Sequence, residues 1–137
     1  MIVLDTNVLA EPLRLSPALK CISWLNEQAA ETLYITTITY AELWAGILRL
    51  PEGKRKKELA TRIASVLDLF KQRTLSFDVS AAQQLGPIVA RTLKAGRAAQ
   101  APDAYIAACA AAHGFAIATR NTKHFEHAGV AVVNPWQ

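Results

Sequence analysis

The chain alternates short runs of strand composition with longer segments in which apolar residues recur at helical spacing. The runs occupy residues 1–4, 32–37, 115–119 and 129–133, with a weaker one at 75–77. Runs of this length and composition are typical of strands, and the first, apolar throughout, indicates a strand buried on both faces. The pattern therefore predicts a sheet of short strands, the first of which begins almost at residue 1.

Segments of helical periodicity fill the intervals between these runs. We expect helices over residues 8–13, 16–30, 39–50, 54–70, 80–96 and 104–113. Ser16-Pro17 fits a helix start with proline in the first position, and Thr39 with Glu42 fits a capping box. Gly114 fits the C-terminal cap of the last helix.

The fifth expected helix carries conflicting signals. Ser80 with Gln83 fits a capping box at its start, whereas Gly86-Pro87 predicts a kink or a restart within it. Because strands alternate with helices along the chain, the sequence predicts an α/β fold with a single domain over residues 1–137 and a mostly parallel sheet.

The composition is that of a packed globular protein. Of the 137 residues, 52% are hydrophobic and 19% are charged, which excludes disorder. No apolar run approaches the length of a membrane span, and the N-terminus lacks the layout of a signal peptide. Cys21 and Cys109 show neither metal-ligand nor redox spacing. We expect them to be reduced core thiols of a cytoplasmic protein that has no membrane partner.

The charge is modestly basic, with 15 Lys and Arg against 11 Asp and Glu and a formal net charge of +4. This excess is compatible with a polyanionic partner without requiring one. Four cations, Lys54, Arg55, Lys56 and Lys57, stand together where a helix begins and oppose its macrodipole. The run is either a solvated helix start or a contact for RNA or an acidic protein partner.

Three acidic residues occupy similar local settings. Asp5 ends the first apolar run, while Glu42 and Asp103 each lie in the expected first turn of a helix. Each has an ordinary alternative: Asp5 as a helix cap, Glu42 within its capping box, and Asp103 against the helix dipole. In a parallel sheet, however, strand ends and the following helix starts share one edge, so the three acids can converge there.

Convergence of three carboxylates would have a chemical consequence. Like charges in a cleft repel one another unless a cation neutralises them. Ligands that are all oxygen atoms select a hard ion such as Mg²⁺ or Mn²⁺. Such an ion lowers the pKa of a bound water and stabilises charge at a phosphate.

Short motifs along the chain resemble the PIN-domain ribonucleases, and more closely the VapC/FitB-type toxins of bacterial toxin–antitoxin pairs. The motifs are Met1–Asn7, Ala41–Leu43, Pro51–Arg55, Pro102-Asp103, Ala118–Asn121 and Pro135-Trp136. The resemblance covers essentially the whole chain and implies an α/β/α sandwich with a central, mostly parallel sheet. It also implies a Mg²⁺- or Mn²⁺-dependent endoribonuclease that is usually a homodimer. A cognate antitoxin would inhibit the enzyme, and the enzyme would contact operator DNA only through that antitoxin.

The resemblance assigns roles to individual residues. Asp5, Glu42 and Asp103 match the family's catalytic metal ligands. Thr6, Asn7 and Thr119 match the polar residues that support those ligands. The chain departs from the family pattern at Asn121, where many relatives have a fourth aspartate. An asparagine oxygen carries no charge, so we expect one firmly bound metal and a weak second position.

These observations predict a metal-dependent ribonuclease toxin that hydrolyses RNA phosphodiester bonds through a metal-activated water. The alternative is a PIN-like module that binds RNA or an antitoxin without efficient cleavage, which Asn121 favours. A receiver-like signalling domain ranks last, because no phosphoacceptor aspartate on a central strand is followed by a suitable lysine. His113 and His124 are expected at the surface or in caps, with His124 able to reach the site mouth. Trp24 and Trp44 are expected in the core or an interface.

Overall fold

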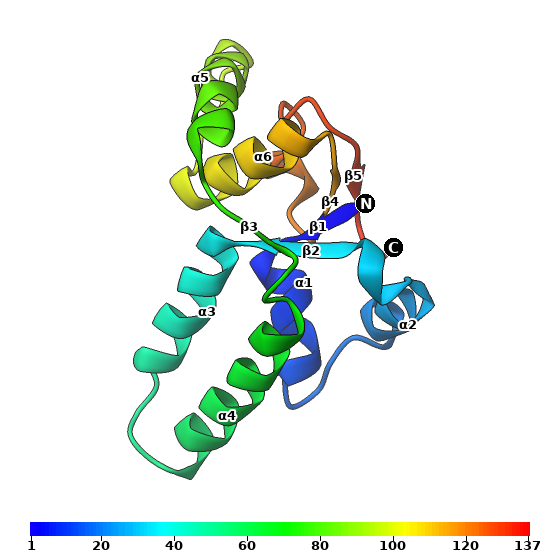
Figure 1. Ribbon diagram of the computed structural model, residues 1–137, viewed down its shortest axis with the longest axis vertical. Helices are drawn as coiled ribbons and strands as arrows, with labels where there is room; N and C mark the ends of the chain where they lie inside the picture. Colours follow the sequence, from blue (N-terminus) through cyan, green and yellow to red (C-terminus); the bar gives the residue numbers. More distant parts are fainter.

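Five short strands form one parallel sheet at the centre of the computed structural model, which describes residues 1–137 (Figure 1). The strands are β1 (Ile2–Leu4), β2 (Leu33–Thr36), β3 (Thr74–Leu75), β4 (Ala116–Ala118) and β5 (Val132–Val133). Their order is β3-β2-β1-β4-β5, and every pairing is parallel. β1 therefore lies in the middle of the sheet, paired with β2 on one side and β4 on the other.

Helices cover both faces of this sheet, which confirms the predicted α/β/α sandwich. They are α1 (Thr6–Ala10), α2 (Leu19–Glu27), α3 (Thr37–Leu48), α4 (Lys54–Leu69), α5 (Val79–Lys94) and α6 (Ala101–His113). Three short 3-10 helices, η1 (Glu11–Leu13), η2 (Ala30–Thr32) and η3 (Thr122–His124), complete the connections. None of the helices is both long and apolar enough to cross a membrane.

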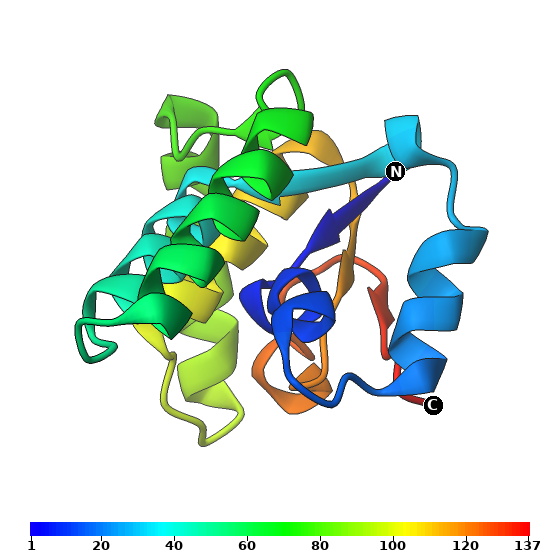
Figure 2. The same cartoon turned by 90° about the horizontal axis from the view of Figure 1, so that it is seen from below.

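Successive strand residues divide the core into two halves, because their side chains point to opposite faces of the sheet. Leu4 and Ile35 pack with the apolar residues of α1 to α4, whereas Val3 and Ile117 pack with those of α5 and α6. Figure 2 shows α1 between α4 and α2 on the first of these faces. Both cores thus meet at β1, which fixes the strand that leads to Asp5.

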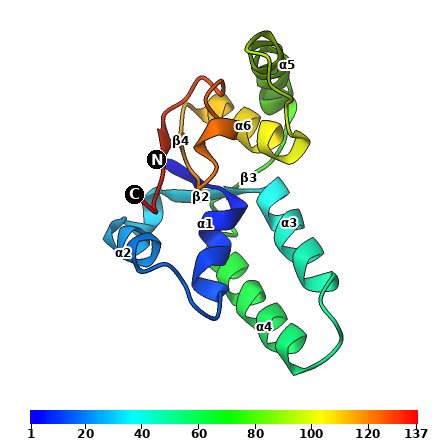
Figure 3. The same ribbon diagram turned by 180° about the vertical axis from the view of Figure 1, so that it is seen from behind.

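The pair α3 and α4 extends away from the sheet as an antiparallel hairpin that lies beside α1 (Figure 3). Leu43 and Ile47 of α3 and Ile63 and Leu67 of α4 are buried in the same core as Leu9 of α1. Packing between these apolar stripes holds the hairpin in place.

The start of α2 differs from the prediction. Ser16-Pro17 does not begin the helix, which starts at Leu19. The Ala18 backbone N–H donates to the Glu11 carboxylate at 2.7 Å, and Ala18 keeps an extended conformation. This contact spans seven positions and delays the start of the helix, so local capping signals do not reveal it.

The two expected capping boxes are wrong as well, because the residue at each strand-to-helix junction provides the cap. Thr36 caps α3 by accepting the Thr39 N–H at 3.1 Å, and Asp78 caps α5 by accepting the Ala81 N–H at 3.0 Å. Glu42 consequently lies in the second turn of α3 rather than the first.

The predicted restart at Gly86-Pro87 is wrong, whereas the predicted cap at Gly114 is confirmed. Pro87 does not restart α5, which continues from Val79 to Lys94. Packing of Ala81 and Ile88 in the core shared with α6 offsets the missing backbone hydrogen bond. Gly114 does cap α6, with the left-handed φ of 67° that glycine adopts most easily.

The two cysteines are free and buried, one in each core, as predicted. Burial raises the pKa of Cys21 and of Cys109 to about 11. Both thiols therefore stay protonated at neutral pH and are chemically inert.

Candidate active site

Asp5 lies at the centre of the candidate site and is held by three neutral donors. Its backbone N–H continues the sheet by donating to the Ala118 carbonyl at 2.9 Å. Its side chain caps α1 by accepting the Thr6 N–H at 2.7 Å. The second carboxylate oxygen accepts from the Thr119 hydroxyl at 2.7 Å and from the Asn7 amide at 2.9 Å. The carboxylate is thus fixed in position by groups on the ends of β1 and β4.

The environment of Asp5 disfavours its charged form. The residue is only 3% exposed. Burial raises the pKa of Asp5 from 3.8 to about 6; the Thr119 and Thr6 hydrogen bonds lower it, and the charges of Asp103 and Glu42 raise it further. No lysine or arginine forms an ion pair with any of these three acids. The site therefore gathers negative charge without a permanent cation of its own.

Glu42 reaches the same site through Thr6. The Thr6 hydroxyl donates to Glu42 Oε1 at 2.6 Å, which joins α1 to α3. Thr6 therefore serves both acids, since its N–H binds Asp5 and its hydroxyl binds Glu42. The ordinary alternative for Glu42, a capping box with Thr39, does not apply because that capping box is absent.

Asp103 enters from the first turn of α6 and is paired with His124. Asp103 Oδ2 and His124 Nδ1 are 2.6 Å apart, and the two side chains are 18% and 44% exposed. An ionised carboxylate only accepts, so this hydrogen bond requires the His124 tautomer that has a proton on Nδ1. The structure places His124 at the rim of the site. The only sequence signal for this position is that His124 follows Asn121 by three residues.

The turn after β4 supports the site mainly through its backbone. The Asn121 N–H donates to the Thr119 hydroxyl at 3.0 Å, and the Arg120 N–H donates to the Asn7 side-chain oxygen at 3.2 Å. The Arg120 guanidinium lies 5.4 Å from the centre of the Trp136 ring. These two N–H groups orient the side chains that hold Asp5, a role that the residue types alone do not reveal.

The three acids each bind a different neighbouring residue and do not together form a complete set of metal ligands. No group of three or more Asp, Glu, His or Cys side chains is arranged so that it could hold an ion. Glu42 is paired with Thr6, and Asp103 with His124. The side chains that could ligate an ion, those of Asp5, Glu42 and Asp103, nevertheless offer only carboxylate oxygen atoms, a set whose chemistry fits a hard divalent cation.

The basic run at the start of α4 divides into residues with different surroundings. Lys54 lies 3.8 Å from Glu58 and Lys56 lies 2.5 Å from Glu52, so each already has an acidic partner. Lys57 lines a shallow pocket with Arg62. Arg55 alone of the four lines a groove of about 330 Å³ between α1, α3 and α4, which also includes Thr6 and Glu42.

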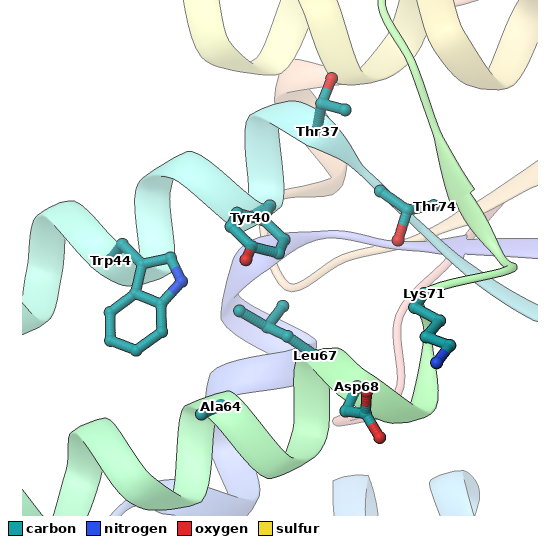
Figure 4. A pocket seen from close by; sticks show the side chains of 8 residues that line it. All are labelled: Thr37, Tyr40, Trp44, Ala64, Leu67, Asp68, Lys71 and Thr74. Atoms are coloured by element: carbon teal, nitrogen blue, oxygen red, sulfur yellow. The ribbon is translucent and has the colours of Figure 1, made fainter.

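A larger cavity of about 490 Å³ lies between α3 and α4, away from the candidate acids. Figure 4 shows Tyr40 and Trp44 from α3, with Leu67, Asp68 and Lys71 from α4 and the turn after it. None of the three candidate acids lines this cavity, so its size does not make it the active site. Trp24 and Trp44 both pack against the core, as predicted.

The comparison with known protein families agrees with this geometry. The family described as "PIN domain" matches residues 2–130. The chain belongs to the PIN-domain family. The match confirms the predicted family. Similarity to proteins named VapC and FitB also confirms the predicted VapC/FitB type within that family.

This PIN-domain chain is similar over its full length to three bacterial proteins. It is 46% identical to plasmid stability protein StbB of Pseudomonas syringae pv. tomato and 41% identical to VapC ribonuclease Y4jK of Sinorhizobium fredii, with 100% of this chain and 99% of each relative covered. It is 43% identical to toxin FitB of Neisseria gonorrhoeae over 99% of both chains. The solved structure of FitAB bound to an IR36 DNA fragment superposes with a TM-score of 0.95 and 42% identity, over 100% of this chain and 96% of the other.

Proposed function

We propose that this PIN-domain chain is a divalent-metal-dependent endoribonuclease and the toxin of a toxin–antitoxin pair. The observation that carries the proposal is Asp5, a buried carboxylate that has two further acids near it and no cation beside it. Retaining such a group costs stability unless a cation compensates it. Its place at the carboxyl end of a central parallel strand is where α/β sheets bind ligands.

Each residue of the site has a defined task in this proposal. Asp5, Glu42 and Asp103 would hold the ion, which when bound supplies positive charge at the scissile phosphate and acidifies a water molecule. Thr119 and Asn7 keep the Asp5 carboxylate in one orientation by donating hydrogen bonds to it. Thr6 fixes Glu42 relative to Asp5, since it donates to both.

The names of similar proteins support the choice of substrate and partner. One relative is called a ribonuclease and another a toxin, and the FitAB structure is bound to DNA. We therefore expect this chain to cleave RNA in the cytoplasm and to be inhibited by a cognate antitoxin. Contact with operator DNA would go through that antitoxin, and the chain itself would form a homodimer. The groove beside Arg55 leads to Glu42 and offers RNA or the antitoxin a path to the site.

A second candidate function follows from the rim of the site. Asp103 is engaged by His124, and Asn121 brings no charge to the turn after β4. A site with few free carboxylates would bind a metal weakly. The chain would then hold RNA or an antitoxin without cleaving efficiently.

One experiment separates the two functions. The purified chain is incubated with a mixed RNA substrate at increasing Mg²⁺ or Mn²⁺, in parallel with chelator and with the Asp5→Asn variant. The ribonuclease proposal expects internal cleavage that requires metal and is lost in the variant. RNA binding without cleavage at any metal concentration would support the second candidate, whereas equal cleavage in chelator would contradict both.

A further inference from the structure

A small polar pocket lies next to the candidate active site and is not used by the function proposed above. It has a volume of about 250 Å³, and its lining consists of Thr92, Arg97, Ala98, Gln100, Lys123 and His124. We infer that this pocket binds one backbone phosphate of the RNA strand, next to the phosphate that is cleaved. The inference deepens the proposed function and rests on it.

The two permanent cations of the pocket are brought together by separate elements. Arg97 follows α5, where Gly96 adopts a left-handed φ of 76° and the Arg97 N–H donates to the Thr92 carbonyl at 3.1 Å. Lys123 lies in η3, directly after the turn that supports Asp5. The local backbone thus places both cations beside the site, although they are 26 positions apart in the sequence (123 − 97).

The chemistry of the lining favours an anion. No carboxylate lines the pocket. Glu126 contacts Arg97 from outside it at 3.5 Å, but both side chains are more than two-fifths exposed, so this pair is weak and easily exchanged. The Thr92 hydroxyl is already committed to the Ile88 carbonyl at 2.8 Å. An anion would therefore meet the guanidinium of Arg97 and the ammonium of Lys123 as its main partners.

The lining also distinguishes a nucleic-acid backbone from a protein segment. Ala98 is its only hydrophobic residue, so a docked peptide would bury almost no apolar surface there. Phosphate groups, by contrast, are bound chiefly by arginine, lysine and neutral polar side chains. We therefore favour RNA over an acidic segment of the antitoxin as the occupant.

His124 connects the pocket to the cleavage site. His124 lines the pocket, and its Nδ1 contacts Asp103 at 2.6 Å. The pocket and the candidate active site therefore lie on either side of the His124 side chain. A strand that places one phosphate at Asp103 can reach the pocket with a neighbouring phosphate. Such a contact carries no sequence information and serves to position the strand.

The test measures binding instead of cleavage, in chelator, with a 5′-labelled single-stranded RNA oligonucleotide and fluorescence anisotropy over a salt series. The doubly substituted variant R97Q/K123Q is compared with the charge-matched control K20Q/R49Q. Lys20 and Arg49 are exposed and line none of the pockets described above. We expect R97Q/K123Q to bind roughly tenfold more weakly, with a salt slope shallower by about 0.7. The variant R97K/K123R, which retains both positive charges, should keep most of the RNA affinity and most of the salt slope.

Two outcomes would contradict the inference that this pocket binds an RNA phosphate. Equal RNA binding by R97Q/K123Q and the control would overturn it, and so would a salt slope that does not differ between them. Circular dichroism melts of all variants verify that they are folded. Because binding is read without cleavage, failure of this test leaves the ribonuclease proposal standing. A wild-type chain that never cleaves RNA would instead refute the proposed function itself.

Discussion

Two buried carboxylates lie at opposite ends of the helical segment that follows β1, and their surroundings differ. Asp5 and Glu11 are each 3% exposed. Glu11 accepts the Ala18 N–H at 2.7 Å and pairs with Arg14 at 3.3 Å. Asp5 receives hydrogen bonds from neutral groups only and has two further acids in its electrostatic surroundings.

The difference separates a structural acid from a functional one. The charge of Glu11 is compensated within the chain, and its hydrogen bond to Ala18 fixes the loop before α2. The charge of Asp5 has no such compensation and is surrounded by more of the same sign. Burial alone therefore does not identify the site. The missing counter-charge does, because it leaves a place for a cation from solution.

The largest expected effect comes from neutralising each acid in turn. Asp5→Asn should lower metal-dependent RNA cleavage by more than about 100-fold, beyond the loss usual for outer-shell partners of a metal, while the fold is retained. Glu11→Gln should leave cleavage within a few-fold but lower the free energy of unfolding by about 1 kcal/mol, because the half-exposed Arg14 pair is lost and the Ala18 N–H loses a charged acceptor. Cleavage rates and urea unfolding of both variants measure this. Equal loss of activity in the two variants would remove the distinction.

The second prediction concerns pH. In chelator, the folded-state pKa of Asp5 lies above its ordinary value of 3.8, at about 6, so the native state binds this proton more tightly than the unfolded state does. Stability relative to Asp5→Asn should therefore be full near pH 4 and be lost as pH rises through 6, by about 3 kcal/mol in total. Urea unfolding of both proteins between pH 4 and 7.5 gives this difference. A difference that does not change with pH would mean that Asp5 is not destabilised by its surroundings.

A smaller effect is expected at Thr6, which links Asp5 to Glu42. Thr6→Val keeps the backbone cap on Asp5 but removes the hydroxyl that donates to Glu42 at 2.6 Å. Metal affinity should fall about tenfold, as for other outer-shell partners. Thr6→Ser retains the hydroxyl and serves as the matched control. If Val and Ser variants titrate identically with Mn²⁺, Thr6 does not position Glu42.

The smallest effect is expected at Asn121, whose backbone N–H supports Thr119. Asn121→Asp adds a charge at the rim, so divalent binding should tighten by a few-fold and less metal should be needed for half-maximal cleavage. Asn121→Ala should weaken binding slightly, since its backbone contact survives. Calorimetric titrations of the three proteins compare them directly. Indistinguishable metal curves would place the residue 121 side chain outside the site.

The sheet and the positions of the acids follow from local sequence patterns. Apolar runs mark the strands, and Asp5 and Asp103 fall at a strand end and a helix start where the fold places them. The start of α2 is less local, because the chain there is held by Glu11, seven positions before the Ala18 N–H that it binds. Sequence signals at Ser16-Pro17 cannot reveal that contact.

The inner and outer parts of the site also differ in how far they can be predicted. The family resemblance implies that Thr6 and Thr119 support the site, and both donate a hydrogen bond to the Asp5 carboxylate. The pairing of His124 with Asp103 joins residues 21 positions apart through a 3-10 turn. The role of Arg120 depends on its backbone N–H rather than on its residue type. The position of His124 three residues after Asn121 predicts that it can reach the site mouth, but no residue pattern indicates its contact with Asp103 or the contact of the Arg120 N–H.

Calorimetric titration of Mn²⁺ into the wild-type chain, Asp5→Asn and Glu11→Gln tests the central claim, that the uncompensated acid is the one that holds the metal. We predict saturable binding of one ion with similar affinity in the wild type and in Glu11→Gln, and no saturable binding in Asp5→Asn. Unchanged binding in Asp5→Asn, or loss of binding in a folded Glu11→Gln protein, would contradict the claim.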